Sequence, residues 1–169
     1  MTWRLTVVSL AVYSLLLAGC GGPPTLERFK PANQDEAVIV SQILKIQNGV
    51  NTRSLDLVMQ PYAEDAFIGN FHKYLGVATP GALRSVTRVQ LRMAYNDLFR
   101  AVKEVSIEIT NFRLTISGNS AAALGKVEMV YSVERSRGES KRPDVVQNEV
   151  LWRMKKGPTG WRIAEEIYQ

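Results

Sequence analysis

The chain of 169 residues has almost no cysteine and histidine, the side chains from which disulfides and most zinc sites are built. It contains one cysteine, Cys20, and one histidine, His72. One cysteine cannot close an internal disulfide, and no spaced cluster of histidine, cysteine and carboxylate residues is present that could bind zinc. His72 lies in a glycine-containing loop outside any apolar face, which fits a solvated residue better than a catalytic one. We therefore expect no metal and no cofactor.

Motifs of the common catalytic classes are also missing. The sequence has no Gly-x-Ser-x-Gly motif, no glycine-rich phosphate loop and no Ser-His-Asp constellation. No internal repeat is visible. What remains as candidate chemistry is a small set of carboxylates, amides and hydroxyls.

The N-terminal segment is the most informative part of the sequence. One positive charge, Arg4, precedes an apolar run over residues 5–17, which is shorter than the ~20 residues of a membrane span and has the length of a signal-peptide core. The stretch Leu17–Cys20 that follows resembles the lipobox of bacterial lipoproteins. This resemblance implies that residues 1–19 are a signal peptide, cleaved before Cys20, and that diacylglycerol is attached to the Cys20 sulfur. An ordinary signal peptide and an uncleaved anchor helix are the alternatives.

A lipid anchor has consequences for location and for the chain behind it. Two or more acyl chains hold a protein durably on a membrane. Gly21 follows the cysteine, whereas an aspartate there is common in lipoproteins retained at the inner membrane. We therefore expect the cell envelope, at the outer membrane and facing the periplasm. The glycines and prolines of Gly21–Pro24 and the polar residues after them predict a flexible tether over residues 20–33.

The rest of the chain has the size of one domain. Removal of residues 1–19 leaves 150 residues, and we place the domain at residues 34–169. The net charge of +5 falls to +4, because Arg4 leaves with the signal peptide. This mild basic excess suits anionic lipid head groups. We expect no nucleic acid as a partner, because an exported lipoprotein rarely meets one.

The sequence of the first half of the domain predicts three helices. Asn33 and Glu36 form a capping-box pattern before a helix that ends near Gly49. A short helix follows over residues 53–60, and the longest helix is predicted over residues 82–102. The expected inner residues are Ala37, Val40, Ile43, Leu44 and Gln47 in the first helix and Leu83, Val86, Gln90, Met93 and Leu98 in the longest one.

Three arginines, Arg84, Arg88 and Arg92, recur every four residues along that longest predicted helix. Like charges at this spacing repel by a few tenths of a kcal/mol per pair in an isolated helix. The stripe is therefore either compensated by carboxylates from elsewhere or turned toward an anionic partner, and a plain solvated face is the simplest interpretation.

The second half of the domain predicts strands. Alternation over residues 105–109 resumes out of phase over residues 112–116, which indicates a β-bulge at Thr110 and Asn111. Three further strands are predicted over residues 127–133, 146–154 and 161–167. Together with the helices, this order predicts an α+β fold, in which a curved antiparallel sheet wraps a long helix and forms a conical cup.

Two short stretches carry a resemblance to a known superfamily. They are the turn Tyr62–Ala66 and the C-terminal stretch Gly160–Glu165. The chain from Asn33 to Gln169 resembles the nuclear transport factor 2-like superfamily, also called the SnoaL-like or cystatin-like cone fold. The resemblance implies the cup and no single function, because the same cup serves isomerases, dehydratases, ligand binders and interaction domains.

The resemblance directs attention to carboxylates in the cup. Members similar to ketosteroid isomerases use a carboxylate as general base, with a tyrosine or a neutral acid that polarises the substrate carbonyl. Glu165 is in phase with Trp161 and Ile163 on the last strand, and a carboxylate that lines an apolar cup has a raised pKa. Asp65 lies at the turn where family members often place an acid. Alternatively, Glu165 lies in water at the mouth of the cup and Asp65 caps its turn.

Further candidates lie on the neighbouring strands. Tyr131 and Asn148 are potential hydrogen-bond donors to a ligand, and Trp152 is a candidate for the lining of the cup. Asn148 has the alternative role of satisfying a backbone group. The first helix has no tyrosine, although isomerase relatives carry one there, and this departure weakens the isomerase interpretation.

These observations favour a membrane-anchored lipoprotein with a non-catalytic binding or scaffolding domain. Its partner would be another protein or a small apolar ligand. A small lyase or isomerase with Glu165 or Asp65 as general base is the alternative. A homodimer through the open face of the sheet is a further expectation, because such dimers are common in the family.

Overall fold

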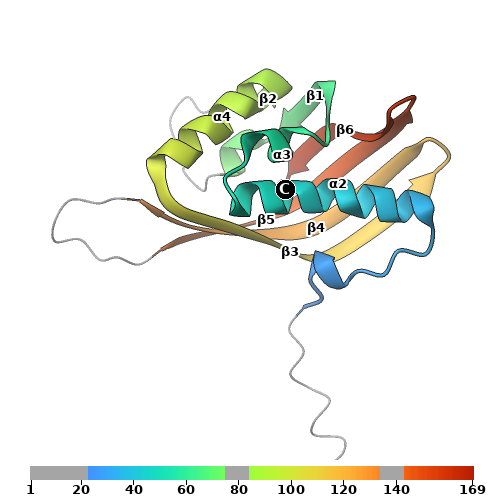
Figure 1. Cartoon of the computed structure of the whole chain (residues 1–169), viewed down its shortest axis with the longest axis horizontal. Coiled ribbons are helices and arrows are strands. Elements are labelled where there is room, and N and C mark those ends of the chain that lie inside the picture. Colours follow the sequence, from blue (N-terminus) through green and yellow to red (C-terminus); the bar gives the residue numbers. More distant parts are fainter. Residues whose placement is uncertain (1–22, 75–83, 134–142) are drawn as a thin grey trace, which may run out of the picture.

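The computed structural model describes residues 23–74, 84–133 and 143–169, so the predicted signal peptide and Cys20 lie outside the described residues. Among these residues, no helix has both the length and the apolar character that a membrane crossing requires. The elements in chain order are η1 (Leu26–Arg28), α2 (Gln34–Asn51), α3 (Leu55–Met59), β1 (Tyr62–Gly69), η2 (Phe71–Lys73), β2 (Ser85–Thr87), α4 (Arg88–Ala101), β3 (Val102–Ser117), β4 (Ser120–Val133), β5 (Asp144–Gly157) and β6 (Gly160–Tyr168) (Figure 1).

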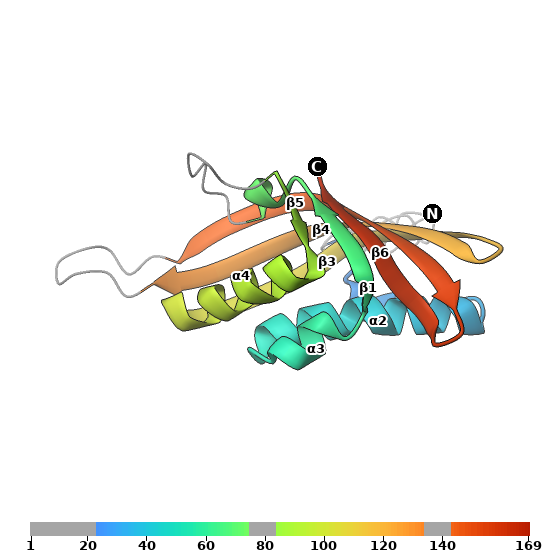
Figure 2. The ribbon, with the colours of Figure 1, turned by 90° about the horizontal axis from the view of Figure 1, so that it is seen from above.

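Six strands form one sheet in the order β2-β1-β6-β5-β4-β3. Neighbouring strands run antiparallel, except that β1 and β6 are parallel. Figure 2 shows the sheet curving over α2, α3 and α4, which lie on one of its faces. The predicted α+β fold with a curved sheet wrapped on helices is confirmed.

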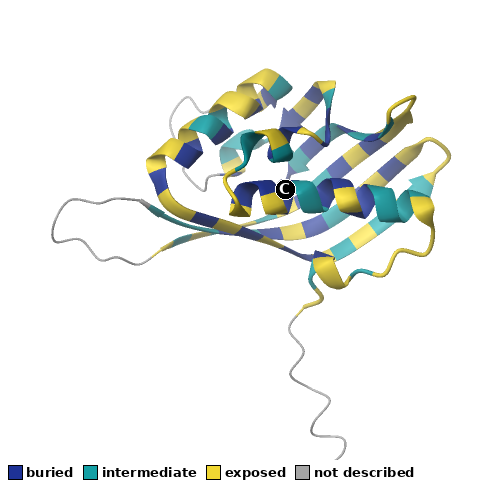
Figure 3. Cartoon of the chain, viewed as in Figure 1, coloured by how far each residue is buried: buried dark blue, intermediate teal, exposed yellow. Residues whose placement is uncertain are grey.

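The long strands bury one face and expose the other (Figure 3). The predicted bulge in β3 is confirmed, because the pairing with β4 shifts between Thr110 and Arg113 and Asn111 adopts a left-handed conformation with φ of 54°. Ile109 before the shift is fully buried, and Phe112 after it packs against the core. The bulge thus lets a strand of 16 residues bend while its apolar side chains stay on the helix side.

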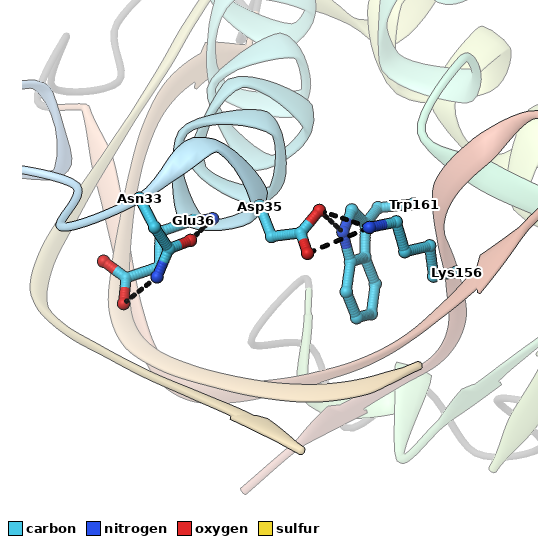
Figure 4. A network of polar contacts seen from close by, with 5 residues as sticks. All are labelled: Asn33, Asp35, Glu36, Lys156 and Trp161. Carbon is cyan, nitrogen blue, oxygen red and sulfur yellow. Dashed lines mark hydrogen bonds and ion pairs between the residues drawn. The ribbon is translucent and has the colours of Figure 1, made fainter. Parts of the chain in front are cut away.

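The first turn of α2 is capped as predicted and also tied to the sheet. The Asn33 side chain accepts a hydrogen bond from the Glu36 backbone N–H at 2.9 Å. Asp35, in the same turn, contacts the sheet (Figure 4). Its carboxylate accepts hydrogen bonds from Lys156 Nζ at 2.7 Å and Trp161 Nε1 at 2.9 Å. These bonds hold the pKa of Asp35 below its usual value. The helix start is therefore fixed to the β5–β6 hairpin.

The predicted end of this helix at Gly49 is wrong, because α2 continues to Asn51. Gly49 instead allows α3 to approach: a Cβ at this position would lie 2.6 Å from the backbone nitrogen of Val58. The buried face also differs in part from the prediction, since Ala37 and Leu44 are only half-buried. The residues of α2 that are buried are Ile39, Val40, Gln42, Ile43, Ile46, Gln47, Gly49 and Val50.

The prediction of one long helix over residues 82–102 is also wrong. Ser85–Thr87 is the edge strand β2, and α4 begins only at Arg88, after a capping box between Thr87 and Gln90. Val86 is buried as a strand residue, whereas Gln90 and Met93 are exposed. The inner face of α4 consists of Leu91, Tyr95, Leu98 and Phe99.

The described part of the predicted tether packs against the domain. Leu26 is fully buried, and Phe29 meets Phe112 edge to face with ring centroids 5.1 Å apart. Thr25 forms a β-bridge with Thr110 at the free edge of β3. From Pro24 onward the chain is therefore docked on the sheet edge, four residues after the predicted lipidation site.

Two amides of α2 cover the same edge of β3. The Asn51 side chain donates to the Ile107 carbonyl at 3.1 Å and accepts from the Ile107 N–H at 2.6 Å. Gln47 accepts from the Ile109 N–H at 3.0 Å. An open strand edge is a template for pairing with another chain, and these bonds satisfy three of its backbone groups.

Candidate functional site

A second bulge, in β6, decides which glutamate faces the helices. Arg153 of β5 lies opposite Glu165, but its neighbour Met154 lies opposite Ile163, so Ala164 is an extra residue in β6. The side chains change phase at this point. Glu165 therefore turns to the outer face, where it forms an ion pair with Arg153 at 2.8 Å. The prediction that Glu165 lies inside the cup is wrong.

Glu166 takes the inner position instead and is 2% exposed. Its carboxylate accepts hydrogen bonds from the Tyr62 hydroxyl at 2.5 Å and from Trp152 Nε1 at 2.8 Å, both on Oε2. The Tyr168 hydroxyl donates to Oε1. The donors come from β1, β5 and β6, three neighbouring strands whose side chains point to the same face. Trp152 lies inside, as predicted.

Burial controls the ionisation of this cluster. It raises the pKa of Glu166, and the hydrogen bonds from Tyr168, Tyr62 and Trp152 oppose that rise. Burial, together with the nearby Glu166 charge, raises the pKa of Tyr62 and Tyr168. The tyrosines therefore keep their protons near neutral pH and remain hydrogen-bond donors.

Aromatic residues continue from this cluster toward η2 and α4. Tyr74 packs on Phe71 with ring centroids 5.6 Å apart, on Tyr168 at 5.2 Å and on Tyr95 at 5.5 Å. Tyr74 is 4% exposed; the Tyr95 hydroxyl donates toward its oxygen, and its own O–H proton has no acceptor among the described residues. Burial raises the pKa of Tyr74 and Tyr95. The interior next to Glu166 thus combines apolar ring faces with a free phenolic donor.

The other predicted site residues lie elsewhere. Asp65 is exposed on β1. The Asn148 side chain donates to the Lys73 carbonyl at 3.0 Å, which ties β5 to η2 and matches its alternative structural role. Tyr131 is half-buried and lines a cavity of about 240 Å³ between β3 and β4. Among the predicted site residues that the structure describes, Trp152 is the one with a hydrogen bond to Glu166.

The arginines do not form one stripe on a helix. Arg84 precedes β2, and Arg88 and Arg92 lie on α4. Arg88 pairs with Glu64 at 3.0 Å, and Arg92 pairs with Asp56 at 2.8 Å. Carboxylates from elsewhere in the chain therefore compensate the charge of two of the three arginines.

Two further features concern ligands. On the outer face, a cavity of about 300 Å³ lies beside the Arg153–Glu165 pair, where Ala122 and Ala164 leave space between larger side chains. Within the described ranges, no three histidine, cysteine or carboxylate side chains lie close enough together to hold a metal ion.

No protein-family model and no curated protein matches this sequence. Solved structures do match. A ketosteroid isomerase-like protein from Erwinia carotovora atroseptica SCRI1043 is 19% identical, with a TM-score of 0.58 over 80% of this chain and 95% of that chain. A hexachlorocyclohexane dehydrochlorinase, LinA type 2, is 15% identical, with a TM-score of 0.59 over 79% and 82% of the two chains. A nuclear transport factor 2-like protein of unknown function from Pseudomonas putida KT2440 is 11% identical, with a TM-score of 0.58 over 79% and 84%.

Identities this low establish the fold alone. The fold is that of the nuclear transport factor 2-like cone, as the resemblance in the sequence implied. The residues that sequence reasoning missed are Glu166 and its partners Tyr62 and Tyr168. A signal for them exists in the pair Glu165–Glu166 after the small Ala164, because a bulge at a small residue exchanges the faces of both glutamates.

Proposed function

We propose that the protein is a lipid-anchored lipoprotein of the bacterial cell envelope whose cone domain binds a partner and does not catalyse a reaction. The lipobox-like stretch that ends at Cys20 supports the anchor, and Gly21 supports the outer membrane. The observation that carries the non-catalytic role is the Glu166 carboxylate, which already accepts three hydrogen bonds from the protein.

A general base must offer a lone pair to a substrate proton within about 2.6–3.2 Å. Glu166 directs its lone pairs to Tyr62, Trp152 and Tyr168. Of the two carboxylates proposed from the sequence, Glu165 pairs with Arg153 on the outer face and Asp65 is exposed on β1. Three lone-pair positions of Glu166 are thus occupied, and neither carboxylate proposed from the sequence lies in the interior.

The ligand class follows from the same interior. The rings of Phe71, Tyr74 and Tyr95 offer apolar contact, and the Tyr74 hydroxyl is free to bond one polar group. We therefore propose a small apolar ligand with a single hydrogen-bonding group. The other proposed binding surface is the outer face of the sheet, where the cavity beside Arg153 lies. A partner protein or a second copy of the chain would bind there.

A lyase or isomerase is the second candidate. The free Tyr74 hydroxyl favours it, because a buried phenol close to a carboxylate is an arrangement that can polarise a carbonyl. This candidate requires that a substrate reach the remaining lone pair on Oε1 of Glu166 or displace one of its donors. It predicts that Glu166→Gln abolishes turnover, for which conversion of a β,γ-unsaturated ketone to its conjugated isomer provides an absorbance assay.

The binding function is tested with 2-naphthol, an apolar ring system with one hydroxyl. We expect saturable binding by fluorescence, about tenfold weaker in Tyr74→Phe, because one neutral hydrogen bond contributes about 0.5–1.5 kcal/mol. Tyr131→Phe, outside the aromatic interior, serves as the matched control. Equal affinities in both variants would contradict the proposed site, and ketone turnover that depends on Glu166 would favour the enzyme.

The anchor is tested in the full chain. Labelled palmitate should be incorporated into the parent and into Thr25→Ala, but not into Cys20→Ser, and the parent should partition into the detergent phase. Cys20→Ser that still incorporates label would exclude lipidation at this residue. Partitioning without incorporation of label would indicate a retained anchor helix.

A further inference from the structure

The docking of the N-terminal segment fixes where a membrane anchor would lie relative to the domain. The backbone carbonyl of Pro24 accepts a hydrogen bond from the Asn111 N–H at 3.1 Å, and Thr25 pairs with Thr110. Leu26 is buried beneath these contacts. The chain is therefore held at the bulge of β3, the edge strand of the sheet.

Pro24 lies only four positions after Cys20. An extended chain spans at most ~3.3–3.6 Å per residue, so the segment from Cys20 to Pro24 is no longer than about 14 Å. If Cys20 carries lipid, as proposed above, the β3 bulge stays within that distance of the head groups. This reach lets the bulge come within about 8 Å of the head groups, the Debye length at physiological ionic strength, where its charges act on the membrane surface.

The charges at this corner are mainly positive. Arg28 and Lys30 belong to the docked segment, and Arg113 follows the bulge two residues after Asn111. All three are exposed, and none forms an ion pair with a described residue. We call these three residues the exit cluster. Glu27 is the single acid of residues 23–32, and it is held by the Gln47 amide at 3.1 Å.

We propose that the β3 edge of the domain rests on the anionic surface of the membrane that holds the lipid, through Arg28, Lys30 and Arg113. The proposal rests on the proposed lipidation of Cys20 and adds a fixed orientation to it. The short segment from Cys20 to Pro24 brings the exit cluster to the head groups, and the attraction between its positive charges and the anionic lipids holds it there.

The orientation decides which part of the domain is accessible. β3 is one edge of the sheet, and β2 is the other edge. In Figure 1, η1 lies at the bottom of the molecule, and α4 and β2 lie at the top. The aromatic interior next to η2 and α4 therefore belongs to the side that is turned away from the membrane and toward ligands in the periplasm.

The test uses the lipidated full-length product in vesicles whose head groups carry an energy-transfer acceptor. Dyes are attached to Thr115→Cys on β3 or to Ser85→Cys on β2, two exposed positions at opposite edges. Lipid occupies the native Cys20 sulfur, so the introduced thiol is the only free one. In vesicles of phosphatidylcholine mixed with phosphatidylglycerol, we expect strong transfer from Thr115→Cys and weak transfer from Ser85→Cys.

The charge variant Arg28→Gln, Lys30→Gln, Arg113→Gln should abolish this difference. Each cation near an anionic surface changes the equilibrium about fivefold, so three shift the ratio of membrane-resting to free orientations about a hundredfold. The matched control Lys73→Gln, Arg84→Gln, Arg100→Gln removes three exposed cations away from the β3 edge and should keep the parent pattern.

Failure of the proposed anchor and failure of the proposed orientation give different outcomes. Chain that carries no lipid and does not bind vesicles of phosphatidylcholine alone overturns the proposed anchor. Lipidated, vesicle-bound chain whose two dyes transfer equally, with or without phosphatidylglycerol, overturns the orientation and leaves the anchor in place. Loss of the difference in the control variant as well would show that net charge acts, and not the exit cluster, and would overturn the proposal too.

Discussion

Replacement of Glu166 tests the interior most directly, because one carboxylate serves three buried donors. In Glu166→Ala, the hydroxyls of Tyr62 and Tyr168 and the indole N–H of Trp152 lose their acceptor together. An unsatisfied buried donor costs about 1–3 kcal/mol, so the free energy of unfolding should fall by at least about 3 kcal/mol. For a domain of this size, that corresponds to a drop in Tm of roughly 6–12 °C.

The conservative variant Glu166→Gln isolates the charge. Its amide oxygen can accept from Tyr62 and Trp152, which share one carboxylate oxygen, and the Tyr168 hydroxyl can rotate to accept from the amide N–H. We therefore expect most of the stability of the parent to remain. What disappears is the titration of the carboxyl group.

The sign of the pH effect follows from the direction of the shift. Burial raises the pKa of Glu166 above its ordinary value of 4.5, so the folded protein binds this proton more tightly than the unfolded chain does. The stability from this group is full below the unfolded pKa and is lost as pH rises through the folded pKa. The parent should therefore lose more stability than Glu166→Gln when the pH is raised from acid to neutral.

Urea unfolding of the mature chain, followed by tryptophan fluorescence over this pH range, measures both effects. The control is Glu165→Ala, which breaks a half-exposed pair with Arg153 and should cost less than about 1 kcal/mol. Glu166→Ala that is as stable as Glu165→Ala would refute the buried network. An identical pH slope in the parent and in Glu166→Gln would refute the raised pKa.

Two further predictions concern packing around α2. Gly49→Ala should destabilise the fold by about 1–3 kcal/mol, because its Cβ would meet the Val58 backbone at 2.6 Å; a variant with unchanged urea midpoint would contradict this close approach. Asn51→Ala removes both hydrogen bonds to Ile107 and should cost about 1–2 kcal/mol and promote self-association, as measured by unfolding and by light scattering; a stable monomer would show that the β3 edge needs no cover.

Sequence reasoning predicts elements well where one periodic pattern extends over many residues. The bulge in β3 is predictable because apolar residues before and after Thr110 and Asn111 keep strict alternation in two different phases. For the bulge in β6 the small Ala164 is an insufficient signal, because only three residues lie between Ala164 and Tyr168 and both phases place apolar residues on the inner face. One undetected residue was enough to exchange Glu165 for Glu166.

The errors in the helices have a different cause. The prediction over residues 82–102 combined Val86, which is buried from a strand, with apolar residues of α4, and the resulting inner face was rotated toward the exposed Met93. The docked segment was missed because Leu26 and Phe29 are isolated apolar residues in a polar stretch. Tertiary contacts with β3 and α2, which have no local signal, hold them in place.

The three hydrogen bonds to Glu166 constrain any catalytic interpretation. Tyr62 and Trp152 donate to Oε2 and Tyr168 donates to Oε1, so a substrate that used this carboxylate as its base would have to reach the remaining lone pair of Oε1 or displace one of the three donors. A displaced donor would be left unsatisfied in a buried site. The Tyr74 hydroxyl has no such conflict, because a ligand that bonds to it removes an unsatisfied group instead of creating one. The interior therefore favours ligands that approach through Tyr74 and leave the Glu166 network intact.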